Sequence, residues 1–125
     1  MNPFQSVYEK IGEDQIRQLT HYFYQEVKKN QELRKLYPEE DLAPAEERLF
    51  LFLLQVFGGP QTYSDRRGHP RLRLRHLNWK IDGKMRNHWL NAMLSAMDQL
   101  DLEPNVKELM MGYFIKVANH MVNHE

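Results

Sequence analysis

The sequence predicts an all-α protein. Apolar residues recur at spacings of three and four along most of the chain, which is the period of a helix with one buried face. No segment alternates with the period of two that a half-buried strand shows. Six prolines divide the 125 residues into helix-length pieces. These observations indicate four main helices joined by shorter pieces, in a single domain that covers residues 1–125.

The first expected helix covers Asp14 to Lys29, where an apolar stripe follows the helical period. The second begins near Pro44, where a proline suits the first turn, and extends to about Phe57. Its apolar run LFLFLLQVF could also be a buried strand. The run is rich in Leu and Phe and follows AEER directly, so we interpret it as a largely buried helix. The stripe of the first helix is Ile16, Leu19, Phe23 and Val27.

The second half of the chain predicts a loop, a short piece and two more helices. Gly58 to about Arg67 reads as a loop, and the short stretch HPRLRLRH is expected to be helical near its end. Asp82 can cap a helix that continues through Leu100. Its stripe is Met85, Trp89, Met93, Ala96 and Met97. Pro104 opens the last helix, whose stripe is Val106, Leu109, Met110, Tyr113, Phe114, Val117 and Met121.

Composition excludes several classes of protein. The chain has no cysteine, so it has no disulfide and no Cys-ligated metal site. Lys and Arg together balance Asp and Glu at 17 each, which argues against a dedicated nucleic-acid-binding protein. No apolar run is long enough to span a bilayer, and MNPFQSVYEK has no signal-peptide core. We therefore expect a cytoplasmic protein that does not contact membranes.

Two clusters of side chains remain to be explained. Five arginines fall between Arg66 and Arg75, with Tyr63 and Trp79 on either side. This pattern is typical of RNA or phosphate binding, but arginines also clamp the carboxylates of a bound cofactor. Polar-tipped aromatic residues are numerous too, and their donors either meet backbone carbonyls or converge on something bound. They are Tyr22, Tyr24, Tyr37, Tyr63, Trp79, Trp89 and Tyr113.

Self-contained catalysis has no support in the sequence. The six histidines form no H-E-x-x-H motif, and Gly58-Gly59-Pro60 lacks the lysine and hydroxyl residue of a phosphate-binding loop. No serine lies in a nucleophile elbow. We assign no residue a certain catalytic role.

Four segments together resemble the bacterial group II truncated haemoglobins. They are LRKLYPEEDLAPAEERL, FGGPQTYSDRRGHPRLRLRHLNW, NHWL and ANHMVN. The resemblance implies a truncated globin fold, a two-over-two helical sandwich around one haem b. It assigns His76 as the proximal ligand, the one protein bond to iron. A neutral imidazole suits that role, because its other nitrogen can donate to a carbonyl that fixes the ring.

The resemblance also assigns the remaining haem contacts. On the distal face it places Tyr24, Tyr37, Ala45, Leu49 and Trp89. Arg48 and Tyr63 match positions that reach the haem propionates, with Arg75 or His69 assisting. Candidates to line the ring are Phe52, Leu53, Phe57, Leu72, Trp79, Ile81, Met93 and Phe114.

The implied function is reversible, high-affinity binding of O2, and of NO and CO, with slow release. Slow release makes simple oxygen transport doubtful, despite the family's conventional name. The alternative is a redox enzyme, an NO dioxygenase or a peroxidase-like protein. It would need an external reductase, because nothing in the chain resembles a flavin or nicotinamide site. A remote alternative is a helical nucleic-acid-binding domain that acts through Arg66–Arg75. The chain is expected to be a monomer or a homodimer.

Overall fold

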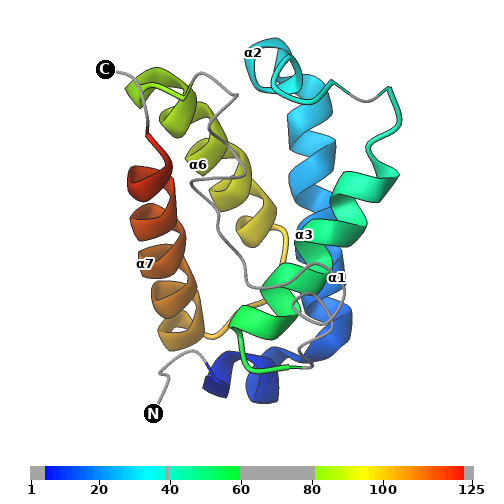
Figure 1. Ribbon diagram of the computed structural model, residues 1–125. Coiled ribbons are helices and arrows are strands. Elements are labelled where there is room, and N and C mark those ends of the chain that lie inside the picture. Colours follow the sequence, from blue (N-terminus) through cyan, green and yellow to red (C-terminus); the bar gives the residue numbers. More distant parts are fainter. Residues whose placement is uncertain (1–4, 39, 60–80, 123–125) are drawn as a thin grey trace.

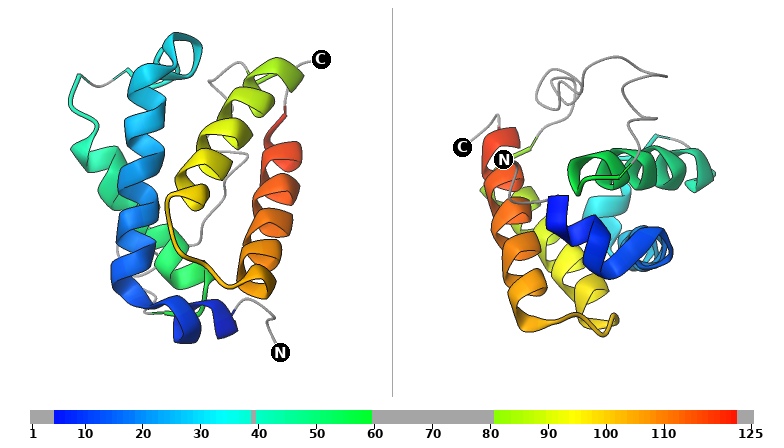
Figure 2. Two further views of the ribbon diagram at one scale, coloured as in Figure 1. Left: turned by 180° about the vertical axis from the view of Figure 1, so that it is seen from behind. Right: turned by 90° about the horizontal axis from the view of Figure 1, so that it is seen from below.

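The helices form two crossed pairs, as Figure 1 shows. The computed structural model describes residues 5–38, 40–59 and 81–122. Their helices are α1 (Gln5–Lys29), α2 (Gln31–Arg34), α3 (Ala43–Val56), α6 (Gly83–Asp98) and α7 (Pro104–Met121). In one pair α1 packs against α3, in the other α6 packs against α7, and α1 joins the pairs by packing on α6. The views in Figure 2 show the same arrangement. No strand occurs among the described residues, and the all-α prediction is confirmed.

Helix α1 is longer than the sequence predicted. It begins at Gln5 rather than Asp14, and it bends at Gly12, where φ is 77° and ψ is 170°. Val7 and Ile11 in the first segment are buried, so that segment has its own apolar face, which the bend sets apart from the later stripe. The four stripe residues after the bend are all fully buried, as expected. The predicted start of this helix was wrong because the bend at Gly12 changes the direction of the buried face, so the apolar residues before and after it do not follow one helical period.

Helix α3 confirms the helical interpretation of the apolar run. It ends within one residue of the predicted Phe57, which is its C-cap. Gly58 follows with φ of 101°, its N–H donates to the Gln55 carbonyl at 3.2 Å, and the Gly59 N–H donates to the Leu54 carbonyl at 2.7 Å. These two bonds form a Schellman motif, in which glycine adopts the left-handed conformation that ends a helix.

The two later helices begin where the sequence placed them. The Asp82 carboxylate caps α6 by accepting from the Met85 N–H at 2.8 Å, and α6 ends at Asp98, two residues before the predicted end. Helix α7 begins at Pro104. One stripe residue is wrong: Leu109 is 37% exposed, whereas Ala118 is buried. The buried face of α7 passes through positions 106, 110, 114, 118 and 121, which leaves Leu109 at its edge.

Among the described residues, no helix has the length and apolar character needed to cross a membrane.

Replacing Gly12 by Ala tests the bend in α1. Nothing lies within 4 Å of a Cβ added at this position, so any cost arises from the backbone conformation alone. That conformation is essentially restricted to glycine, and we expect Gly12→Ala to lower the free energy of unfolding by about 1–3 kcal/mol in urea. Gly83→Ala is the matched control, since Gly83 has no positive φ and the substitution should cost nothing measurable. Equal stability of both variants would show that the bend is unstrained.

Candidate functional site

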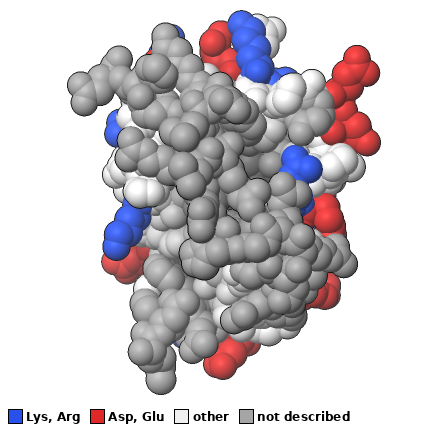
Figure 3. Space-filling model, viewed as in Figure 1, with Lys and Arg blue, Asp and Glu red and all other residues white. Residues whose placement is uncertain are grey.

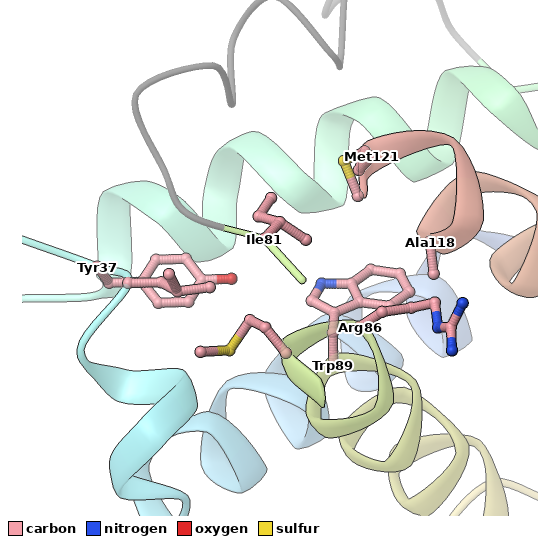
Figure 4. Close-up of a pocket in the computed structure, with 8 residues that line it drawn as sticks. Tyr37, Ile81, Arg86, Trp89, Ala118 and Met121 are labelled. Carbon is pink, nitrogen blue, oxygen red and sulfur yellow. The ribbon is translucent and has the colours of Figure 1, made fainter. Parts of the chain in front are cut away.

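A pocket lies between α6, α7 and the chain that follows α2 (Figure 4). It opens partly to solvent. In Figure 4 the Tyr37 hydroxyl and the Trp89 indole nitrogen point toward one another across it. Two polar tips therefore enter a space whose walls are mainly apolar. The lining residues are Leu36, Tyr37, Ile81, Met85, Arg86, Trp89, Ala118 and Met121.

Trp89 presents its N–H to this pocket. Its ring packs edge to face against Phe23 at a centroid distance of 5.6 Å and against Phe114 at 6.0 Å, which fixes the indole between α1 and α7. Within residues 5–38, 40–59 and 81–122, no group accepts a hydrogen bond from the indole nitrogen. Because tryptophan can only donate, this N–H is suited to an acceptor on a bound molecule.

Tyr24 and Tyr37 form the polar side of the same region. Their rings meet edge to face, with centroids 5.6 Å apart, and Tyr24 is only 4% exposed. Burial raises the pKa of Tyr24 far above its ordinary value, and the neighbouring Tyr37 raises this pKa further by its charge and a side-chain hydrogen bond. The nearby Arg48 acts in the opposite direction. Tyr24 therefore stays a neutral hydroxyl, able to donate, through the whole physiological pH range.

An arginine on α2 holds the segment that carries Tyr37. The Arg34 guanidinium donates to the Tyr37 carbonyl at 2.8 Å and to the Glu40 carbonyl at 3.2 Å. A planar, multiply donating group that binds two carbonyls restrains the connection between α2 and α3. The backbone of Tyr37 is thus restrained from outside the pocket.

Asn30 joins α2 to α6 with a single side chain. Its oxygen accepts from the Leu33 N–H at 3.1 Å and so caps α2. Its amide nitrogen lies 3.0 Å from His88 Nδ1. Since the oxygen is already an acceptor, the amide nitrogen donates, and neutral His88 carries its proton on Nε2. That Nε2 is buried with no partner among the described residues. Asn30 therefore fixes α2, which precedes Tyr37, against the turn of α6 that carries Trp89.

The structure brings together some of the residues that the sequence singled out. Tyr37 and Trp89 line the pocket, and Tyr24 adjoins Tyr37. On α3, Ala45 is buried, while Arg48 and Leu49 are half-buried. The remaining assignments lie outside the described residues. They are His76, Tyr63, His69 and the arginine segment Arg66–Arg75.

The ring-lining candidates divide in the same way. Ile81 lines the pocket. Phe52, Leu53, Phe57, Met93 and Phe114 are buried in the core, and Leu72 and Trp79 lie outside the described residues. Sequence reasoning missed five pocket residues: Leu36, Met85, Arg86, Ala118 and Met121. Met85 and Met121 were expected on the apolar stripes of their helices. The spacing of apolar residues does not distinguish a residue packed in the core from one that lines a pocket.

At the rim of the face that Figure 3 shows, Lys and Arg of the described residues lie near Asp and Glu.

Comparison with known proteins decides the family. The model of the bacterial-like globins matches residues 6–123. The group 2 truncated haemoglobin YjbI of Bacillus subtilis is 38% identical over 120 residues, which cover 96% of this chain and 90% of that protein. The chain belongs to the group II truncated haemoglobins.

Solved haemoglobin structures share the fold of this truncated haemoglobin over nearly their whole length. The thermostable haemoglobin of Thermobifida fusca has a TM-score of 0.91 at 46% identity, with 98% of both chains covered. The truncated oxygen-avid haemoglobin of B. subtilis has a TM-score of 0.89 at 38% identity, covering 94% of this chain and 98% of that one.

Membership implies a haem cofactor and ligand binding at the haem, since globins bind diatomic gases. The described residues of this truncated haemoglobin fit such a group. A porphyrin has apolar faces, and the pocket offers Leu36, Ile81, Met85 and Met121 to them. A hydrogen-bond donor stabilises a polarised ligand, and the Trp89 N–H enters the pocket without an acceptor among the described residues. The truncated globin fold predicted from the sequence is confirmed.

A double-mutant cycle measures the contact between Asn30 and His88. Asn30→Ala removes both the cap and the contact with His88, whereas His88→Ala leaves the cap of α2 intact. We expect a coupling energy of about 0.5–1.5 kcal/mol from urea unfolding, the net value of one hydrogen bond. Asn30→Asp is the control: it keeps the capping oxygen and should retain most of the cap's contribution of about 0.5–2 kcal/mol. A coupling energy of zero would mean that the 3.0 Å contact does not tie the helices together.

Proposed function

We propose that this truncated haemoglobin binds O2 reversibly, with high affinity and slow release, at a haem b that contains one iron. The observation that supports this most is the Trp89 N–H, which points into an apolar pocket opposite the Tyr37 hydroxyl and has no acceptor among the described residues. The family's ligand chemistry gives these donors a purpose. NO and CO belong to the same ligand class and would enter the same pocket.

The donors act on the charge of the ligand. A haem, when bound, would supply the iron that takes up a diatomic gas, and O2 would carry partial negative charge there. Trp89 and Tyr37 can each donate one hydrogen bond toward that charge. Tyr24 packs edge to face against the Tyr37 ring and so helps to hold it in place. A hydrogen bond to a charged acceptor contributes about 1.5–3 kcal/mol, which corresponds to release that is slower by about 10- to 100-fold.

The remaining assignments complete the proposed site. His76 is the proximal ligand, and it is the one residue of this proposal that bonds to iron. Arg48 and Tyr63 hold the haem propionates, which orients the macrocycle more than it stabilises it, because a rim ion pair contributes about 1 kcal/mol or less. Ala45 and Leu49 border the distal side. The small Ala45 side chain leaves entry open, while Leu49 and Trp89 narrow it.

Replacing Trp89 by Phe tests the distal donor. Trp89→Phe keeps an aromatic ring between Phe23 and Phe114 and removes the N–H, so the O2 dissociation rate should rise about tenfold or more. The rate is measured by stopped-flow spectroscopy, with O2 captured by dithionite. Met85→Leu is the matched control, because Met85 lines the same pocket without an N–H, and its dissociation rate should stay close to that of the parent protein. An unchanged rate in Trp89→Phe would contradict the role of the indole and transfer it to Tyr24 or Tyr37.

Replacing His76 by Ala tests the proximal ligand. Without its bond to iron, haem should be lost rapidly to a haem-scavenging apoprotein, whereas the parent protein retains it. His120→Ala is the control, since His120 is exposed at the end of α7. Full retention of haem with an unchanged ferrous spectrum in His76→Ala would exclude His76 as the ligand.

A further inference from the structure

One face of α7 is exposed along its whole length and is nearly symmetric in sequence about Gly112. Seven exposed positions fall on a single stripe at the helical spacing. Residues equally far from Gly112 on either side form pairs of related or opposite character. At three residues the pair is Leu109 and Ile115, at four it is Glu108 and Lys116, and at seven it is Asn105 and Asn119. The seven residues are Asn105, Glu108, Leu109, Gly112, Ile115, Lys116 and Asn119.

The charges of this face have no partners in their own helix. The residues four positions away from Glu108 are Pro104 and Gly112, and those four positions away from Lys116 are Gly112 and His120. Neither charged side chain therefore has an opposite charge at the spacing that brings side chains together on a helix. No ion pair between described residues includes Glu108 or Lys116. The neighbouring Lys107, in contrast, is paired with Asp98 at 2.6 Å. Glu108 and Lys116 thus remain available for contacts outside the subunit.

The apolar residues of this face are exposed as well. Leu109 is 37% exposed and Ile115 is 42% exposed, and these two are the large hydrophobic residues most exposed in the described part of the chain. Nothing lies within 4 Å of a Cβ added at Gly112, so packing inside the subunit does not require glycine there. A glycine in mid-helix lowers helix stability, and its missing side chain allows another helix to approach closely.

We propose that α7 pairs antiparallel with α7 of a second copy of this chain, across a two-fold axis that passes beside Gly112. Such an axis places each residue level with the residue equally far from Gly112 on the other copy. Glu108 then lies level with Lys116 of the second copy, and Leu109 with its Ile115. Every pairing occurs twice, as a two-fold interface requires. A partner without this sequence would match neither the charges nor their order.

The rest of the subunit leaves this face accessible. Figure 1 shows α7 at one edge of the helix assembly, with α6 beside it. The Asn119 side-chain oxygen accepts from Arg86 Nη1 at 3.1 Å, which orients the amide and leaves its nitrogen free to donate to Asn105 of the second copy. One helix pair is a small interface, so the dimer forms at high protein concentration. The pocket faces the other side of α7, where Ala118 and Met121 line it, and both copies keep their ligand sites.

Charge reversal tests the pairing by sedimentation velocity of the haem-loaded protein, over a concentration series that reaches the millimolar range. Glu108→Lys and Lys116→Glu each place two like-charge pairs in the interface and should weaken dimerisation about tenfold or more. Mixing the two variants should restore a dimer that contains one copy of each, because their charges are then complementary. The double variant Glu108→Lys/Lys116→Glu should dimerise like the parent chain. Glu13→Lys and Lys84→Glu, on exposed positions of other helices, are the controls and should leave dimerisation unchanged.

Gly112→Leu tests the close approach. The added side chain meets nothing in the subunit, so thermal unfolding at low protein concentration should be unchanged or occur at a higher temperature. The dimer should be lost. A parent protein that stays monomeric throughout the concentration series would overturn the proposal. So would a dimer that is insensitive to both single charge reversals, or one that the mixture of variants does not restore.

Discussion

Seven aromatic rings, packed edge to face in an unbroken series, connect the helices of this truncated haemoglobin and determine where its pocket donors lie. Successive centroids are 5.1 to 6.0 Å apart, in the range that the quadrupoles of aromatic rings favour. The series begins beside the pocket at Tyr37 and includes Trp89, so core packing fixes the two donors. The rings come from α1, α6, α7, the C-cap of α3 and the segment after α2, so no single helix could place them. The rings in order are Tyr37, Tyr24, Phe23, Trp89, Phe114, Phe57 and Tyr113.

The placement of these donors explains why an apolar pocket can bind a small polarised gas. Hydrogen bonds are stronger where the local dielectric constant is low, and a donor already held in place loses little conformational entropy when a ligand arrives. Burial keeps Tyr24 neutral, as the direction of its pKa shift indicates. Contacts outside the pocket restrain its walls, through Arg34 at the Tyr37 carbonyl and Asn30 at His88. The pocket is therefore prepared by the fold before any ligand enters.

The sequence predicted what depends on local periodicity and missed what depends on distant contacts. The apolar stripe, the Asp82 cap and the prolines located α3, α6 and α7 to within two residues, because these signals act within one or two turns. The bend at Gly12 reset the phase of the pattern, so the start of α1 was wrong. No local signal could reveal the contact between Asn30 and His88, which are 58 residues apart. The family resemblance singled out Tyr37 and Trp89, which the structure brings to one pocket, while His76 stays a prediction.

The visible absorption spectrum of the purified protein, recorded as isolated, after dithionite and then under air, tests the central claim most directly. The claim is that the pocket beside Trp89 holds a haem that binds O2 tightly. It predicts a Soret band, a shift on reduction and a stable oxygenated ferrous form that persists in air. A protein that shows no haem band, even after hemin is added, would contradict it.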